Sequence, residues 1–346
     1  MIETELYDLE NDDFETSIAA AGKVIARGGT VVFPTETVYG LGADATNADA
    51  VAKIFKAKGR PGDNPLIVHV SDVAQAGALV KTVPEKAKKL AEAFWPGPLT
   101  LIMARSERVP DRVTAGLLTV AVRFPSHPAA KALIDAAGTP IAAPSANISG
   151  RPSPTKSNHV LEDMIGKVDA ILIDADTEVG LESTVMDMTS EPPTMLRPGG
   201  VTVRQIEEII GKIELSPNIT ENIIPEKAKS PGMKYKHYAP KGIMVIARGS
   251  DDEKAAKITS AIKGLGPDDM PAILATDETM RHYQRGLIVS LGSRDDPESM
   301  SHNLFARLRD FDAMGVTHIF AEEIAMSDAT MALNNRMYKA AGYTFI

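Results

Sequence analysis

Residues 28–42 of this 346-residue chain read GGTVVFPTETVYGLG. A short apolar strand over 31–33 is followed at once by a segment that offers threonine hydroxyls, a carboxylate and a phenol between flexible glycines. Open α/β sheets bind their ligands just beyond strand ends. The segment is therefore either part of a ligand site or a turn whose threonines cap a helix.

The residues around this stretch alternate between helical and strand patterns. Upstream, apolar residues recur at helical spacing over 14–25 and stop at a glycine pair, as at a helix C-terminus. Downstream, the pattern predicts a mixed α/β domain. Its helices cover 48–58, 84–94, 127–137 and 203–210, and its strands cover 66–70, 99–103, 118–123, 140–143, 170–174 and 184–188.

A second regular region follows a proline-containing stretch. Residues 212–240 hold four prolines and little apolar periodicity, which is typical of a linker. Beyond it, strands at 243–247, 272–275, 287–291 and 318–321 alternate with helices at 252–263, 298–314 and 329–341. This alternation predicts a small doubly wound parallel sheet. We expect a domain over 1–211, a linker over 212–241 and a second domain over 242–346.

Composition narrows the function classes. The chain has 37 basic and 46 acidic residues, a net charge of −9, and no cysteine. Disulfides, thiolate catalysis and cysteine-ligated metals are excluded, and the acidity argues against a general nucleic-acid coat. No apolar run is long enough for a membrane span, and the acidic N-terminus lacks a signal-peptide pattern. We therefore expect a cytoplasmic protein.

Local basic residues suggest a phosphate site. Lys53, Lys56, Lys58 and Arg60 occur with no acid before Asp63. A helix C-terminus attracts single cations, but four charges in eight residues favour a polyanion such as a triphosphate. The usual glycine-rich nucleotide motifs are absent.

Other polar residues allow two interpretations each. Arg123 ends an apolar strand and needs a paired anion, which is either an internal carboxylate or a ligand. His69 is either a core histidine or a ligand contact. Ser145 and Asn147 follow the strand at 141–143 and could form an Asx turn instead of a site. The segments 182–184 (EST) and 197–199 (RPG) are not specific alone.

Taken together, these segments resemble the YrdC-like threonylcarbamoyl-AMP synthases, in the long form with an extra C-terminal domain. The family's K-x-R…S-x-N pattern matches Lys58, Arg60, Ser145 and Asn147. Residues 34–42, 64–66 and 95–100 also match, and 230–240 is similar to the long form's interdomain segment. The resemblance implies a twisted open mixed sheet with flanking helices, followed by a smaller Rossmann-like α/β domain.

The resemblance also implies a reaction. ATP, L-threonine and bicarbonate would give L-threonylcarbamoyl-AMP and pyrophosphate, with Mg²⁺ held by the phosphates. A tRNA threonylcarbamoyl transferase complex would receive the product. The implied catalytic residues are Lys58, Arg60, Ser145 and Asn147. These four would also bind ATP, together with Ser153, Arg197, Tyr235 and His237. The implied threonine-binding residues are Thr35, Tyr39, His69, Arg123, Ala143 and Ser183.

Two further possibilities accompany this interpretation. The basic part of 230–240 is either a solvated linker or a lid that excludes water from the reactive anhydride. The alternative function is a module that binds double-stranded RNA or tRNA without catalysis, and weak tRNA binding would suit the enzyme too. Carbamoyl transfer of the hydrogenase-maturation type fits less well, since those proteins carry cysteine zinc modules.

Overall fold

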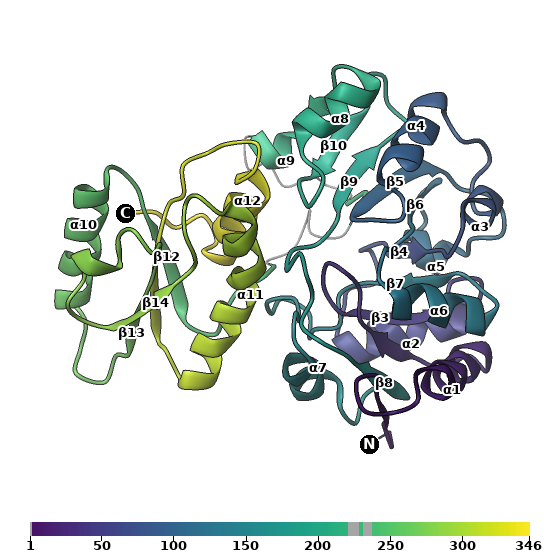
Figure 1. Cartoon of the computed structure of the whole chain (residues 1–346), viewed down its shortest axis with the longest axis horizontal. Helices are drawn as coiled ribbons and strands as arrows, with labels where there is room; N and C mark the ends of the chain where they lie inside the picture. Colours follow the sequence, from purple (N-terminus) through teal and green to yellow (C-terminus); the bar gives the residue numbers. More distant parts are fainter. Residues whose placement is uncertain (1, 221–227, 231–236) are drawn as a thin grey trace. The chain divides into compact units, whose positions relative to one another are not determined.

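The computed structural model describes residues 2–220, 228–230 and 237–346, which form two compact units (Figure 1). The first unit comprises 1–149, 154–178 and 182–235. The second comprises 150–153, 179–181 and 236–346. In the part of the chain described, no helix is both long and apolar enough to cross a bilayer.

The first unit is built on an 11-stranded sheet with the order β1-β8-β2-β3-β7-β4-β6-β5-β9-β10-β11. Parallel and antiparallel pairs alternate irregularly along it, so the predicted mixed sheet is confirmed. Its strands are β1 Glu5–Asp8, β2 Val31–Phe33, β3 Gly40–Asp44, β4 Ile67–His69, β5 Leu99–Ala104, β6 Thr119–Arg123, β7 Ile141–Ala143, β8 Ala170–Ile173, β9 Thr184–Asp187, β10 Thr194–Arg197 and β11 Glu214–Leu215.

Helices cover one face of this sheet and part of the other. Its helices are α1 Phe14–Ala26, α2 Ala48–Lys58, α3 Val73–Ala78, α4 Glu85–Phe94, α5 Asp111–Thr114, α6 Pro128–Ala137, α7 Ser157–Met164, α8 Val203–Ile210 and α9 Pro217–Thr220. Helices α2, α4, α7 and α8 share a large apolar core with one face. Helices α1 and α6 lie side by side over β2, β7 and β8 on the opposite face.

The remaining part of that second face has a different cover. A small apolar cluster there joins five neighbouring strands, through Ile67, Ile102, Ala121, Val185 and Leu196, to Ala228. All of its members lie on strands except Ala228, which belongs to the predicted linker. This patch, called the β4–β10 face below, carries one part of the candidate site.

Strand β3 is a departure from the expected organisation. The sequence predicted a polar loop through residue 42, but β3 begins at Gly40 and pairs antiparallel with both β2 and β7. A Cβ on Gly42 would lie 2.5 Å from Ile141 Cγ2 and 2.8 Å from the Phe33 ring. Glycine is therefore required here by close packing, not by a turn.

The second unit has a four-stranded parallel sheet with the order β12-β15-β13-β14, which confirms the predicted Rossmann-like fold. Its strands are β12 Ile243–Ala247, β13 Pro271–Ala275, β14 Leu287–Ser290 and β15 His318–Glu322. Its helices are α10 Asp251–Lys263, η1 Met280–His282, α11 Pro297–Met314 and α12 Met331–Ala340. A core that includes Ile258, Ile273 and Phe320 joins α10 to the sheet.

Two short loops, 150–153 and 179–181, belong to this second unit. The sequence had predicted them as part of the first domain. Arg309 of α11 is buried and donates two hydrogen bonds to the Pro152 carbonyl oxygen, from Nε at 3.1 Å and Nη2 at 2.8 Å. The Ala239 amide donates to the Gly150 carbonyl oxygen at 2.9 Å. These bonds explain why 150–153 belongs with α11 and not with the large sheet.

Candidate functional site

Neighbouring strands bring polar side chains together on the β4–β10 face. His69 of β4 and Thr100 of β5 are both register partners of Arg123 on β6. Directly paired residues point to the same side of a sheet. The three side chains therefore form a polar row beside the apolar cluster, and all three are buried.

Arg123 is paired with an internal carboxylate. Its Nη2 lies 2.7 Å from Glu36 Oε2, and the two side chains are only 5% and 4% exposed. Glu36 Oε1 also accepts a hydrogen bond from the Ser126 amide at 3.2 Å. Buried Arg123 Nε has no hydrogen-bond partner among the residues described. The pair answers one alternative left open by the sequence and leaves part of the guanidinium for a ligand.

His69 lies in the same row and is held neutral. Burial, followed by the positive charge of Arg123, lowers the pKa of His69 to about 3. Its ring packs edge-on against Phe33 with 5.9 Å between the ring centroids. Buried Nδ1 has no hydrogen-bond partner in the described parts of the chain. A neutral imidazole with one unused nitrogen can bind a polar ligand group.

Ser183 and Arg197 extend the row beyond β5. The Ser183 hydroxyl lies 2.8 Å from Thr100 Oγ1 and accepts a hydrogen bond from Arg197 Nη2 at 3.1 Å. Arg197 Nε also donates to the Ser183 carbonyl oxygen at 3.0 Å. Arg197 thus fixes the turn that enters β9. Thr100 was not among the predicted site residues, although it lies in the 95–100 segment that matches the family.

Lys58 is the centre of a second cluster. Its Nζ donates to the Ser145 carbonyl oxygen at 2.5 Å and to that of Asn147, and lies 3.5 Å from Asn147 Oδ1. The Ser145 hydroxyl donates to Asn147 Oδ1 at 2.5 Å, and the Ser149 amide donates to the Lys58 carbonyl oxygen at 3.0 Å. The structure therefore brings Lys58, Ser145 and Asn147 together.

The end of α2 positions this basic cluster. Gly59 caps the helix in a left-handed conformation with φ 61°, which turns the chain sharply after Lys58. Arg60 is then held by two carbonyl oxygens, those of Asn64 at 3.3 Å from Nε and of Pro65 at 3.1 Å from Nη2. Lys58 and Arg60 are buried, whereas Lys53 and Lys56 are exposed.

The first segment of the sequence has a structural role of its own. Thr35 Oγ1 accepts from the Thr37 and Val38 amides at 3.2 Å and donates to the Val38 carbonyl oxygen at 2.6 Å, so it stabilises a local turn. The buried Tyr39 hydroxyl donates to the carbonyl oxygens of Asp174 at 2.7 Å and Ala175 at 3.2 Å. Both side chains have protein partners, and their proposed contact with threonine remains a prediction.

The remaining predicted site residues lie in different parts of the chain. Ala143 is buried at the end of β7, so its side chain offers only a methyl group. Ser153 and His237 group with the second unit, and Tyr235, like most of 230–240, lies outside the described residues.

Part of the predicted linker packs on the β4–β10 face. Ala228 is buried in its apolar cluster, and Lys229 Nζ lies 2.7 Å from Asp187 Oδ2 at the end of β9. Burial alone would raise the pKa of Asp187, but hydrogen bonds from Lys229 and Thr189 lower it. Here the linker is anchored to the sheet.

The described residues contain no group of three or more histidine, aspartate or glutamate side chains arranged to hold a metal ion. Glu36, the carboxylate beside the polar row, is paired with Arg123.

Two family profiles match the chain. One, described as "Telomere recombination", matches residues 23–199. The other, described as "Threonylcarbamoyl-AMP synthase, C-terminal domain", matches residues 201–342. Together they span both regions that the sequence analysis distinguished.

Curated proteins and solved structures agree with the profiles. Threonylcarbamoyl-AMP synthase from Pyrococcus abyssi is 45% identical over 332 residues, 96% of each chain. The protein of that name from Bacillus subtilis is 45% identical over 329 residues, 95% of this chain and 94% of its own. The crystal structure of P. abyssi Sua5 complexed with L-threonine superposes with a TM-score of 0.91 at 42% identity, covering 100% of this chain and 99% of that one.

The mixed sheet, the basic cluster at the end of α2 and these relatives define an enzyme with nucleotidyltransferase-type chemistry. The chain belongs to the threonylcarbamoyl-AMP synthase family, in the long form with the additional C-terminal domain.

Proposed function

We propose that the enzyme forms L-threonylcarbamoyl-AMP from ATP, L-threonine and bicarbonate and releases pyrophosphate. The observation that carries the proposal is the pairing of two different recognition sites on one sheet. A buried lysine and arginine suit a triphosphate, and the polar row on the β4–β10 face suits an amino acid. A 42% identical relative has been solved with L-threonine.

The proposed reaction has two steps. The threonine amine adds to bicarbonate, with loss of water, to form a carbamate. A carbamate oxygen then attacks the α-phosphorus of ATP in line, and the bond to pyrophosphate breaks. Neither step needs a protein nucleophile, so the enzyme acts by positioning the reactants and stabilising charge.

The threonine subsite of the proposal is the polar row. The carboxylate of threonine pairs with the free edge of Arg123, whose Nε has no hydrogen-bond partner among the described residues. Glu36 pairs with Nη2 of the same guanidinium and holds it in place, and a buried donor without a partner is costly until a ligand satisfies it. His69, Ser183, Thr35 and Tyr39 surround the amine and hydroxyl, and Ala143 contacts the ligand through its backbone.

The nucleotide subsite of the proposal is the Lys58 cluster. Lys58 and Arg60 neutralise the triphosphate and the leaving pyrophosphate, and Ser145 and Asn147 hold phosphate and carbamate oxygens. Ser153, Arg197, Tyr235 and His237 support the nucleotide. Mg²⁺ enters with ATP, as part of the substrate complex, because its oxygen ligands come from the phosphates.

The product is a mixed anhydride that water would hydrolyse, so it needs a prompt acceptor. We propose that a tRNA threonylcarbamoyl transferase complex in the cytoplasm takes up the group to form N6-threonylcarbamoyladenosine.

The test is pyrophosphate release by the purified full chain with ATP and Mg²⁺, with threonine and bicarbonate each present or omitted. Lys58→Met keeps the length of the buried side chain but removes its charge. Lys56→Met is the matched control, since Lys56 is exposed on the same helix. We expect release to require both co-substrates, to fall at least about 100-fold in Lys58→Met and to be unchanged in Lys56→Met.

Release without threonine would overturn the proposed acceptor. Near-normal release by Lys58→Met would overturn the role of Lys58. Fluorescence of Trp95, the single tryptophan of the chain, verifies that each variant is folded.

A further inference from the structure

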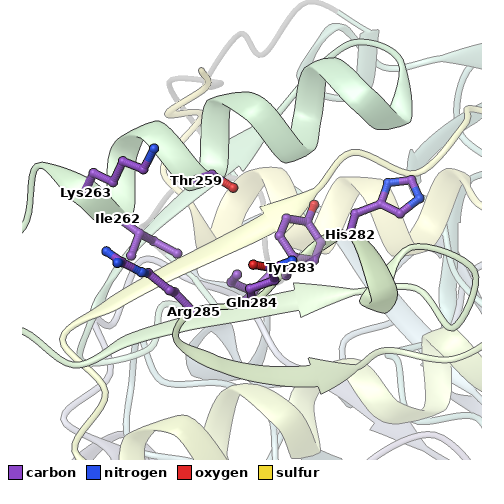
Figure 2. Close-up of a pocket in the computed structure, with 8 residues that line it drawn as sticks. Thr259, Ile262, Lys263, His282, Tyr283, Gln284 and Arg285 are labelled. Atoms are coloured by element: carbon purple, nitrogen blue, oxygen red, sulfur yellow. The ribbon is translucent and has the colours of Figure 1, made fainter.

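A cavity in the second unit has no place in the reaction proposed above. It measures about 310 Å³ and is lined by residues from α10, β13, η1 and the loop that leads to β14. The lining residues are Thr259, Ile262, Lys263, Ile273, His282, Tyr283, Gln284 and Arg285 (Figure 2). Its volume lies at the small end of the range for ligand pockets, roughly 300–1,000 Å³.

The charge of the cavity is one-sided. Lys263, Arg285 and His282 line it, and none of the eight lining residues is acidic, although the chain as a whole carries −9. Figure 2 shows Lys263 and Arg285 on either side of Ile262 at one end of the cavity, and His282 toward the other end. The sequence from 279 to 294 contains no acid.

The two cations are not used by the protein. Within the described residues, neither Lys263 nor Arg285 forms an ion pair or a side-chain hydrogen bond. Lys263 is the last residue of α10, where the helix dipole favours a cation. That explanation does not extend to Arg285, which lies in the loop before β14.

The wall of the cavity is apolar and flat. Tyr283 belongs to the buried core of the second unit, and its hydroxyl donates to Glu322 Oε1 at 2.6 Å, so the hydroxyl is engaged and only the ring contributes to the lining. Burial and the hydrogen bond to Glu322 raise the pKa of this phenol. Ile262 and Ile273 complete the wall, with the Thr259 hydroxyl and the Gln284 amide as neutral polar groups.

A second cavity in the same unit shows the contrast. It measures about 520 Å³ and lies beyond the carboxyl ends of β12 and β15, with Asp251, Lys254, Arg294 and Glu323 in its lining. Its cations are already paired, because Arg294 makes two hydrogen bonds to Asp251, at 2.8 and 2.9 Å, and Lys254 Nζ lies 3.0 Å from the same carboxylate. This cavity offers no free charge to an anion.

We infer that the 310 Å³ cavity binds a small phosphate monoester with a flat or apolar body, of the size of a nucleoside monophosphate. Two unpaired cations match the charge of a phosphate monoester, about −1.5 to −2 at neutral pH, and arginine and lysine are the usual phosphate-binding side chains. The tyrosine ring and the isoleucines receive the body of the ligand.

Methyl NMR of the full chain labelled at isoleucine tests this inference, with AMP as the probe. Ile262 and Ile273 line the cavity, whereas Ile54 and Ile67 belong to the first unit and report binding at the reaction site separately. We expect saturable shifts of the Ile262 and Ile273 methyl signals with AMP. Adenosine lacks the phosphate and inorganic phosphate lacks the nucleoside, so each should require at least about tenfold higher concentration for the same shifts.

The variant pair Lys263→Ala/Arg285→Ala should weaken the AMP response of these two methyls at least about tenfold. The control pair Lys257→Ala/Arg281→Ala removes one charge from the same helix and one from η1, outside the cavity lining, and should leave the response unchanged.

Several results would overturn the inference. These are unshifted methyls, an unchanged response in the Lys263→Ala/Arg285→Ala pair, equal affinity for adenosine or phosphate, or a response to a short RNA hairpin but not to AMP. A failure here leaves the proposed reaction untouched, because pyrophosphate release does not involve this cavity.

Discussion

Glu36→Gln should destabilise the first unit far more than a surface carboxylate would. The substitution leaves the Arg123 charge buried without its carboxylate partner, because the two side chains are only 5% and 4% exposed. Removing one partner of such a pair costs about 3–5 kcal/mol. The amide keeps the shape of the carboxylate and can still accept the Ser126 hydrogen bond. We therefore expect a loss of unfolding free energy at the lower end of this range, about 3 kcal/mol.

Urea unfolding followed by Trp95 fluorescence measures this loss, because Trp95 packs against the large core of the first unit. For a slope of about 3 kcal/mol per molar urea, the midpoint falls by roughly 1 M. Glu92→Gln is the control, since Glu92 lies 3.9 Å from Lys88 with both side chains more than 60% exposed (65% and 63%). It should cost less than about 1 kcal/mol.

The double variant Glu36→Gln/Arg123→Met sharpens the result. Removing both charges leaves no uncompensated ion, so the double variant should be more stable than Glu36→Gln alone. If Glu36→Gln costs no more than Glu92→Gln, the pair is not energetically buried and the reasoning about Arg123 is wrong.

Three other substitutions follow from the same site. Tyr39→Phe removes the hydroxyl that holds the carbonyl oxygens of Asp174 and Ala175, and should cost about 1–2 kcal/mol in urea unfolding; no loss would mean that water replaces the bond. The pKa of His69 is lowered from 6.5 to about 3, so between those pH values the unfolded chain binds more protons and stability falls as the pH falls. His69→Gln should flatten that slope, and an unaltered pH profile would show that His69 does not cause it. Gly59→Ala places a side chain at φ 61° with no atom within 4 Å of its Cβ, so its cost of about 1–2 kcal/mol in unfolding free energy comes from the backbone conformation. Gly62→Ala is the control, because Gly62 also has open space around its Cβ but no positive φ. It should leave stability nearly unchanged.

Elements with a clear apolar period could be predicted from the sequence. The helix over 48–58 has the predicted bounds in α2, and the strand over 243–247 has them in β12. Helix α7 Ser157–Met164 was missed because its sequence, SNHVLEDM, is short and mostly polar. Strand β3 was missed because its glycines, which are depleted in strands, are required there by packing against Phe33 and Ile141.

The site could be predicted only in part. The resemblance to the family grouped Lys58, Ser145 and Asn147 in one site, and the hydrogen bonds of Lys58 bring them together. The partner of Arg123 could not be predicted, because Glu36 is distant in sequence and meets it only through the order of the sheet. Periodicity reports which face a residue occupies, but not which loop folds back over that face.

The two loops 150–153 and 179–181 belong to the second unit although they lie far before it in the sequence, and this limits where the chain can be divided. A chain cut after residue 241 would leave the 150–153 loop without Arg309 of α11, which donates to the Pro152 carbonyl oxygen. An isolated 242–346 fragment would keep a buried guanidinium that had lost the Pro152 carbonyl oxygen. A cut at the linker alone therefore also separates a loop in the first part of the chain from its hydrogen-bond donor in α11.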